Sequence, residues 1–436
     1  MPYKSGALTG LSYETIKSFW TLLKRGEKKI FKVWFFMNNM LVGIVGRPNT
    51  GKSTFFKAAT LSDVLIANYP FATIKPNHAM AYVKLVDLAP EFGKVSMPRE
   101  GHVKDADGVK GKFRFVPFDL IDVAGLVEGA SEGKGLGNEF LNDLAGANAF
   151  IQVVDMSGET DAEGKPTENY YPGKDIRVIE QELDLWYKGI LSKVWKVFAR
   201  TTEMKKENFA EAVAKQFSGL KVKADDVKYV ILYGKFDAEK PSTWSDVEVF
   251  RFAKELRKYT KKMIIAANKM DRENSKKNLE RLKEEFQYEI IPCFAEGELA
   301  LREADKHGLI YYMPGDKDFK IIKELNDKQK QALEKIREFL KEYSSTGVQE
   351  VLNKIVFDIL KYVAIFPAGD KLEDSKGNVL PDCFLMPPNS TALDFAFRLH
   401  TDIGKNFVKA IHVKSKKAVG KDYVLKNRDG LEILTK

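Results

Sequence analysis

Cysteine and histidine are scarce in this chain of 436 residues, which contains two cysteines, Cys293 and Cys383, and five histidines. Two cysteines exclude the dense disulfide framework of small secreted proteins, and we therefore expect a reducing, cytoplasmic setting. The histidines are scattered along the sequence, so no zinc-type cluster is expected from their spacing.

Long apolar runs are also missing, and integral membrane association is not expected. The segment 1–39 is unusual because it is rich in aromatic residues yet interrupted by lysines, and it carries +5 of the net charge of +9. Three interpretations remain for it: a packed amphipathic helix, a weak membrane-surface helix, or an upstream start with Met40 as the true beginning. We favour the last, because the first predicted strand begins at Met40. The rest of the chain carries a net charge of only +4, which does not indicate nucleic-acid binding by the body of the chain.

The most informative motif lies at residues 46–53, where Gly-Arg-Pro-Asn-Thr-Gly-Lys-Ser matches the P-loop pattern G-x-x-x-x-G-K-[ST]. An apolar run at 40–45 precedes it and a helix is predicted from 52 to 61, which is the context that the motif requires. In such a loop the backbone N–H groups and the positive end of the helix cradle phosphates. We expect Lys52 to reach the β- and γ-phosphates and Ser53 to bind Mg²⁺. The predicted nucleotide-binding residues of this loop are Asn49, Thr50, Gly51, Lys52, Ser53 and Thr54.

Two further motifs follow in the order that a guanine-nucleotide site requires. Asp122 and Gly125 form D-x-x-G after a strand-like run, which places Asp122 to hold Mg²⁺ through water and the Gly125 amide to sense a γ-phosphate. Asn268-Lys269-Met270-Asp271 matches N-K-x-D after the apolar run 263–267. The Asp271 carboxylate can accept from guanine N1–H and the 2-amino group, a donor pair that adenine lacks, so discrimination can be large. Each short motif alone also fits an ordinary polar turn, but three in order favour a nucleotide site.

Together these motifs resemble the P-loop GTPases of the Obg superfamily, and within it the YchF-like group. The segment 68–77, Asn-Tyr-Pro-Phe-Ala-Thr-Ile-Lys-Pro-Asn, is similar to an Obg-type switch I, and the glycine-rich segment 125–141 is similar to an Obg-type switch II. The resemblance implies that Thr73 in switch I meets Mg²⁺ and the γ-phosphate, and that Lys52, Thr73 and Gly125 form the catalytic set. It also implies a K⁺ ligand at Asn49, as in some relatives.

Two departures from the general GTPase pattern affect the predicted activity. Leu126 follows Gly125 where a Ras-like enzyme has a water-orienting glutamine, which is usual in the Obg superfamily and predicts slow intrinsic hydrolysis. YchF proteins often carry an altered N-K-x-D and are associated with ATP, whereas this chain retains Asp271, so we predict GTP. The last guanine motif is present only as Phe294-Ala295-Glu296, where the Ala295 amide could meet guanine O6 or simply close a buried strand.

The fold class predicted from strand candidates near 40–45, 113–121, 149–154, 262–267 and 288–293 is α/β, a doubly wound sheet. A helical insertion is expected at about 157–242, either as a hairpin that packs on itself or, as a minority hypothesis, as a partner-docking element. A second helical region at 326–362 leads to an expected hinge at 366–369. The predicted domains are an N-terminal extension at 1–39, a GTPase domain at 40–365 and a C-terminal domain at 366–436.

The C-terminal segment resembles a TGS domain, a ubiquitin-like β-grasp module. A short helix is predicted from about 390 to 402, and strands near 407–410, 421–425 and 429–433. Residues 405–421 contain six lysines and no acidic residue. This stripe could follow RNA phosphates or could be a lysine-protected strand edge, and the resemblance favours RNA or the ribosome.

The sequence therefore predicts a monomeric, cytoplasmic GTPase that binds GTP or GDP with Mg²⁺, hydrolyses GTP slowly as a conformational switch, and associates with the ribosome or structured RNA through its TGS domain. Two alternatives stay open, an ATPase of the YchF type and a nucleotide-gated scaffold with negligible hydrolysis.

Overall fold

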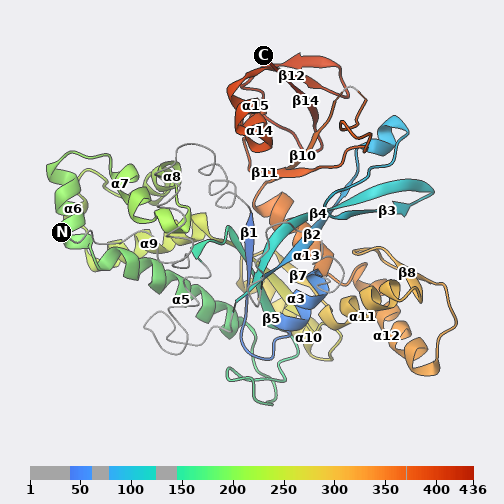
Figure 1. Cartoon of the computed structure of the whole chain (residues 1–436). Helices are drawn as coiled ribbons and strands as arrows, with labels where there is room; N and C mark the ends of the chain where they lie inside the picture. Colours follow the sequence, from blue (N-terminus) through green and yellow to red (C-terminus); the bar gives the residue numbers. More distant parts are fainter. Residues whose placement is uncertain (1–39, 61–77, 124–144, 370) are drawn as a thin grey trace, which may run out of the picture. The chain divides into compact units, whose positions relative to one another are not determined.

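The computed structural model describes residues 40–60, 78–123, 145–369 and 371–436 (Figure 1). Its contacts divide these residues into two compact units, the first built from Leu41–Phe56 and Ile121–Ala295, the second from the described parts of Lys57–Leu120 and Glu296–Lys436. The extension at 1–39, switch I with Thr73, and switch II with Gly125 and Leu126 lie outside the described residues. The predicted domain boundaries stay predictions.

The first unit is built on parallel strands in the order β1-β5-β6-β7. Their residues are buried almost without interruption, as expected for a parallel sheet covered on both faces. The end of β4 lies beside β1: directly after β4, the N–H of Val123 donates to the carbonyl oxygen of Ile44 in β1 at 3.2 Å. The carboxyl ends of these strands share one edge of the sheet, which gathers the loops that follow them. The bounds are β1 Leu41–Val45, β4 Val109–Asp122, β5 Ala149–Asp155, β6 Lys262–Asn268 and β7 Ile290–Pro292, with helices α3 Lys52–Thr60 and α10 Ser275–Glu285.

The segment between β5 and β6 contains five α-helices, which pack together around a hydrophobic core of their own (green to yellow in Figure 1). Their apolar residues recur at helical spacing, and large side chains such as Tyr187, Trp195, Phe209 and Phe252 are buried in one cluster. The insertion thus packs on itself, but as five helices rather than the expected hairpin, and the helical region continues past 242 into α9, which begins after a capping box at Ser245. The bounds are α5 Gly173–Ser192, α6 Trp195–Met204, α7 Phe209–Gln216, α8 Ala224–Gly234 and α9 Asp246–Thr260.

The second unit contains the antiparallel pair β3–β4 with β2 beside β4, followed by the second helical region. Neither β2 nor β3 was predicted, because both mix lysine and histidine with apolar residues. A π-helix, Lys354–Ile359, ends the helical region. The bounds are β2 His78–Val86, β3 His102–Ala106, α11 Ala295–Lys306, β8 Ile310–Tyr312, β9 Phe319–Ile321, α12 Asp327–Tyr343 and α13 Val348–Asn353.

The C-terminal part of this unit is a five-stranded β-grasp sheet in the order β11-β10-β14-β12-β13, packed against α14. The hinge expected at 366–369 is wrong in part, because Phe366 and Pro367 are the last residues of β10 and pair with β14. The strand expected at 421–425 is also wrong, since only an isolated bridge joins Val424 to Thr391. The bounds are β10 Val363–Pro367, β11 Phe384–Met386, α14 Ala392–Leu399, α15 Thr401–Lys405, β12 Phe407–His412, β13 Lys417–Val419 and β14 Gly430–Thr435.

None of the helices in the described ranges combines the length and apolarity needed to cross a membrane.

Candidate nucleotide-binding site

The loop between β1 and α3 has the backbone that a phosphate cradle requires. Asn49 and Gly51 adopt positive φ angles of 62° and 86°, which turn successive peptide groups to one side. Gly46 cannot carry a side chain, because a Cβ atom there would lie 2.7 Å from the carbonyl oxygen of Val153 in β5. The N–H of Phe55 donates to the Gly51 carbonyl at 2.8 Å and begins the helical hydrogen bonding of α3. The loop therefore ends at a helix N-terminus, where anions bind.

Lys52, Ser53 and Asp122 meet at the mouth of this loop. The Lys52 ammonium forms an ion pair with the Asp122 carboxylate, and the Ser53 hydroxyl donates to the other carboxylate oxygen at 3.4 Å. Both charged side chains are about nine-tenths buried, since 12% of Lys52 and 11% of Asp122 remain exposed. A hydroxyl and a carboxylate are hard oxygen donors of the kind that Mg²⁺ prefers beside phosphate oxygens. The residues present thus fit a Mg²⁺ site of the nucleotide-dependent type.

Asn268 connects the two ends of the site. Its Nδ2 donates to the Thr50 carbonyl oxygen in the phosphate loop at 3.0 Å, and its Oδ1 accepts from the Ala295 N–H at 3.1 Å. The side chain is buried, and the two hydrogen bonds use both ends of its planar amide, the NH₂ group and the carbonyl oxygen. One carboxamide therefore fixes the spacing between the phosphate loop and the loop after β7.

The rest of the N-K-x-D motif is held by a second network. The Lys269 ammonium lies 2.6 Å from Asp155 at the end of β5, and the Asp155 carboxylate also accepts from Ser157 and Thr160. The N–H of Met270 donates to the Cys293 carbonyl oxygen at 3.1 Å, which secures the loop from the other side. Asp271 follows with a side chain that is 9% exposed. The carboxylate predicted to recognise guanine is thereby carried on a firmly anchored turn.

The Ala295 amide has a specific partner in this structure, the Oδ1 of Asn268. A contact with guanine O6 would require this N–H to be shared or to turn, so the assignment of Ala295 to the base stays a prediction. Thr54 lies in the first turn of α3 and stays a predicted contact of the nucleotide as well.

Two side chains of the phosphate loop contact the chain between β5 and the first turn of α5, and no pattern in the sequence indicates either contact. The Asn49 Nδ2 donates to the Gly164 carbonyl oxygen at 2.8 Å, which leaves its Oδ1 as the atom that a K⁺ ion would use. Arg47 Nε lies 3.2 Å from Asp175 Oδ1, and the hydroxyl of Tyr170 donates to the same carboxylate oxygen at 2.7 Å. Burial raises the pKa of Asp175. The partners are more than 100 residues apart, so no local pattern could predict them.

A phosphate loop, an adjacent Lys–Ser–Asp cluster and an anchored N-K-x-D turn on a parallel sheet define a nucleotide hydrolase of the P-loop GTPase class. Family models match residues 41–184 as a 50S ribosome-binding GTPase, 266–370 as the G4 motif-containing domain of the YGR210-like Obg-like GTPases, and 362–435 as a TGS domain. A GTP-binding protein of Methanocaldococcus jannaschii is 46% identical over 91% of this chain and 99% of its own length. The chain belongs to the Obg-like GTPases, in the YchF-like group with a C-terminal TGS domain.

Among other relatives, some are named as GTP-binding proteins and others as ATPases. A GTP-binding protein of Schizosaccharomyces pombe is 31% identical over 81% of this chain and 88% of its own length, and the ribosome-binding ATPase YchF of Buchnera aphidicola is 26% identical over 85% and 88%. The crystal structure of a GTP-binding protein from Pyrococcus horikoshii superposes with a TM-score of 0.73 at 37% identity, over 91% of this chain and all of that one.

Proposed function

We propose that this chain is a guanine-nucleotide switch that binds GTP with Mg²⁺, hydrolyses it slowly, and changes its affinity for the ribosome or a structured RNA as it does so. The observation that carries the choice of GTP is the N-K-x-D turn. Asp271 is retained there, and Asn268 ties the turn to the phosphate loop at 3.0 Å. A carboxylate held in place by its surroundings can discriminate strongly between guanine and adenine.

The chemistry assigned to each residue follows from its position. Lys52 would exchange its ion pair with Asp122 for the β- and γ-phosphate oxygens, and the backbone N–H groups of the loop would bind the same phosphates. Ser53 and Asp122 would hold Mg²⁺, which neutralises charge on the phosphate oxygens when bound. Thr73 and Gly125, outside the described residues, would complete the γ-phosphate site. Because Leu126 cannot orient water, hydrolysis would be slow unless a cation at Asn49 or a partner supplies charge stabilisation.

The lysine stripe of the TGS domain is the proposed contact with RNA. Lys409 on β12 and Lys417 on β13 are exposed, as are Lys405 and Lys421 beside them, whereas Lys414 is paired with Glu91 at 2.8 Å. Strand β13 is the edge of its sheet, so the stripe is also suited to the protective role of edge lysines. Co-sedimentation with ribosomes in GTP, in GDP and without nucleotide separates the two. Release by Lys409→Glu and Lys417→Glu supports the contact, and equal binding by both variants contradicts it.

The test of the central proposal is a side-by-side titration of GTP and ATP against the purified protein in Mg²⁺ and K⁺. A clear preference for GTP supports Asp271 as the residue that recognises the base. Equal or tighter binding of ATP would favour the second candidate, a YchF-type ATPase. The observation in favour of this candidate is that the Ala295 N–H, the expected donor to guanine O6, already donates to Asn268.

Single-turnover hydrolysis then distinguishes a switch from a nucleotide-gated scaffold. If neither K⁺ nor ribosomes accelerate hydrolysis, binding alone sets the conformation and the scaffold is the better description. The proposed location is the cytoplasm and the proposed state is a monomer, which sedimentation velocity can check.

A further inference from the structure

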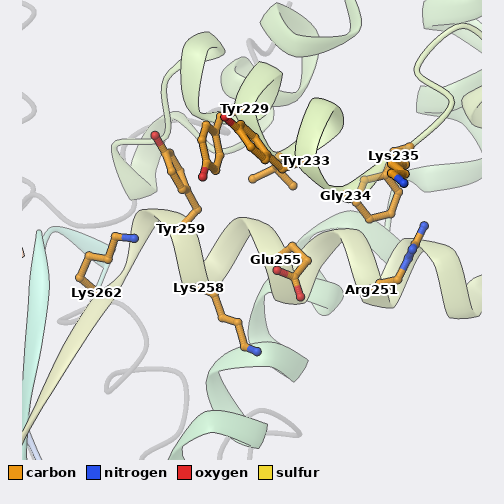
Figure 2. A pocket seen from close by; sticks show the side chains of 11 residues that line it. Tyr229, Tyr233, Gly234, Lys235, Arg251, Glu255, Lys258, Tyr259 and Lys262 are labelled. Carbon is orange, nitrogen blue, oxygen red and sulfur yellow. The ribbon is translucent and has the colours of Figure 1, made fainter. Parts of the chain in front are cut away.

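The helical insertion contains a cavity of about 530 Å³ between α8, the turn after it and α9 (Figure 2). The volume is in the range of small-ligand sites. Its walls combine three tyrosines with four cations and a single carboxylate, Glu255. None of these residues belongs to the nucleotide site described above, so the cavity needs an explanation of its own.

The three tyrosines form a continuous stack. The rings of Tyr229 and Tyr233 have their centroids 4.2 Å apart, and those of Tyr229 and Tyr259 are also 4.2 Å apart with an interplanar angle of 20°. The ammonium of Lys262 lies 5.0 Å from the Tyr259 centroid and closes that end of the stack by a cation–π contact. At the other end Tyr233 is 68% exposed. The stack is therefore closed on one side and open to a further flat ring on the other.

Tyr229 and Tyr233 are not required by the packing of the insertion, whereas Tyr259 packs against its buried core. The buried cluster of this region includes Val227 and Val230 from α8 but not Tyr229 or Tyr233, which lie on the exposed side of that helix. Leu232, between them, is 72% exposed. Exposing large side chains in a row costs solubility, which favours a role in binding.

The cations of the cavity are not held in close ion pairs, although Arg251 and Lys262 interact at longer range with Glu248 and Asp226. Within the described part of the chain, none of Lys235, Arg251, Lys258 and Lys262 forms an ion pair. Arg251 lies over the ring of Phe236, 4.3 Å from its centroid, so its charge stays at the cavity. Figure 2 shows Arg251, Glu255 and Lys258 along α9 below the tyrosines. With Glu255 included, the walls carry a net positive charge.

Flat aromatic faces next to unpaired cations match one ligand chemistry well, an unpaired nucleobase with its phosphates. Single-stranded nucleic acids are held by base stacking on aromatic rings and by basic grooves that follow the backbone. Paired bases offer no free face to such a stack, because each is already covered by its neighbours. A protein helix would use the exposed apolar residues but would leave the four cations without partners.

We propose that the tyrosine stack of Tyr229, Tyr233 and Tyr259 binds an unpaired base of single-stranded RNA, and that Lys235, Arg251 and Lys258 bind the adjacent phosphates. This site is separate from the proposed TGS contact and does not depend on the guanine nucleotide. Its failure would leave the proposed switch untouched.

The test uses the full chain and a fluorescein-labelled single-stranded RNA of about twelve nucleotides, with the duplex of the same sequence as the comparison. Fluorescence anisotropy is expected to give tighter binding of the single strand. Tyr233→Ala removes one stacking face and should weaken binding about tenfold, from a stacking contribution of about 1–3 kcal/mol per base. Tyr233→Phe keeps the ring and should bind within about twofold of the parent protein. Lys258→Ala should lower the slope of log affinity against log salt by about 0.7.

Lys215→Ala is the matched control, because Lys215 is an exposed lysine of α7 that does not line the cavity. Its affinity and salt slope should equal those of the parent protein. GTP affinity is measured on the same preparations, so that a misfolded variant is recognised. An unchanged affinity of Tyr233→Ala, or equal affinity for duplex and single strand, would overturn the proposal and leave the stack as a face for a protein partner.

Discussion

A Cβ atom on Gly51 would lie 2.3 Å from the Nδ2 of Asn268. The two residues are 217 positions apart, yet they lie in contact because the phosphate loop and the N-K-x-D turn follow β1 and β6, whose carboxyl ends share one edge of the sheet. Two features therefore require glycine at position 51: the positive φ of +86°, and the amide of Asn268, which leaves no room for a Cβ atom.

Gly51→Ala is expected to lose nucleotide affinity by more than about tenfold, because the new methyl group must push Asn268 off the Thr50 carbonyl and distort the cradle. Isothermal titration with GTP measures the loss. Gly108→Ala is the control, since Gly108 also has a positive φ, +74°, but nothing lies within 4 Å of its added Cβ. The control should cost about 1 kcal/mol of stability and leave GTP affinity unchanged. Equal GTP affinity in both variants would show that the contact with Asn268 is unimportant.

Asp271→Asn is expected to change base selectivity rather than phosphate binding. The amide replaces one carboxylate acceptor by a donor, which mismatches the 2-amino group of guanine and suits the 2-oxo group of xanthine. GTP affinity should fall by about 10²-fold or more while ATP affinity stays level, and xanthosine triphosphate should gain affinity. Competition against a fluorescent nucleotide measures all three. Parallel losses for GTP and ATP would contradict the role of Asp271.

The buried ion pair of Arg47 and Asp175 predicts a large stability effect. Only 7% of each side chain is exposed, so Asp175→Ala leaves a guanidinium buried without its partner and should cost about 3–5 kcal/mol in the free energy of unfolding. Replacing both partners, in Arg47→Met with Asp175→Leu, should recover much of the loss. Urea unfolding followed by circular dichroism gives both numbers. A single variant that loses less than about 1 kcal/mol would mean that water replaces the pair.

His102 predicts how the stability of the second unit depends on pH. Its pKa is lowered to about 4, first by burial and then by the nearby charges of Lys104 and Arg302, and its ring stacks on Phe115 at a centroid distance of 4.5 Å. Because the folded pKa lies below the unfolded value of about 6.5, the unfolded chain binds more protons between these values. Stability is therefore full above about pH 6.5 and lost as the pH falls towards 4, by about 2 kcal/mol between pH 7.5 and 5.

His102→Phe keeps the stacking but cannot be protonated. The difference between the two proteins in urea unfolding at pH 7.5 and pH 5 isolates the histidine from the carboxylates that titrate in the same range. If the two lose stability in parallel, His102 does not carry the effect.

The sequence predicts the parallel strands well, because each is a buried apolar run and most of them end directly in a motif. Strands β2 and β3 escaped prediction for the opposite reason, since half-buried strands place charged residues such as Lys84 and Lys104 among apolar ones. The helical segment expected at about 157–242 does not include α9, which carries a polar outer face and whose start at Ser245 is marked only by a local capping box.

The residues of the nucleotide site also divide into those that the sequence predicts and those that it does not. Lys52, Ser53 and Asp271 follow from contiguous motifs with a chemical reason at each position. The links from Arg47 and Asn49 to Asp175 and Gly164 do not, because they depend on how a loop after β5 folds back over the phosphate loop. Contacts of this kind join distant segments through ordinary polar groups, and single-sequence patterns carry no trace of them.

The shared core of the helical insertion limits how the chain can be re-engineered. Phe252, Ala253 and Leu256 of α9 are buried in one cluster with residues of α6, α7 and α8, while the same α9 leads the backbone into β6. A shortened chain that jumps from α5 to α9 would keep the contact between these two helices but uncover the apolar side chains of α9 that pack on α8. Transfer of the insertion to another scaffold must therefore move all five helices together, because they share one buried core.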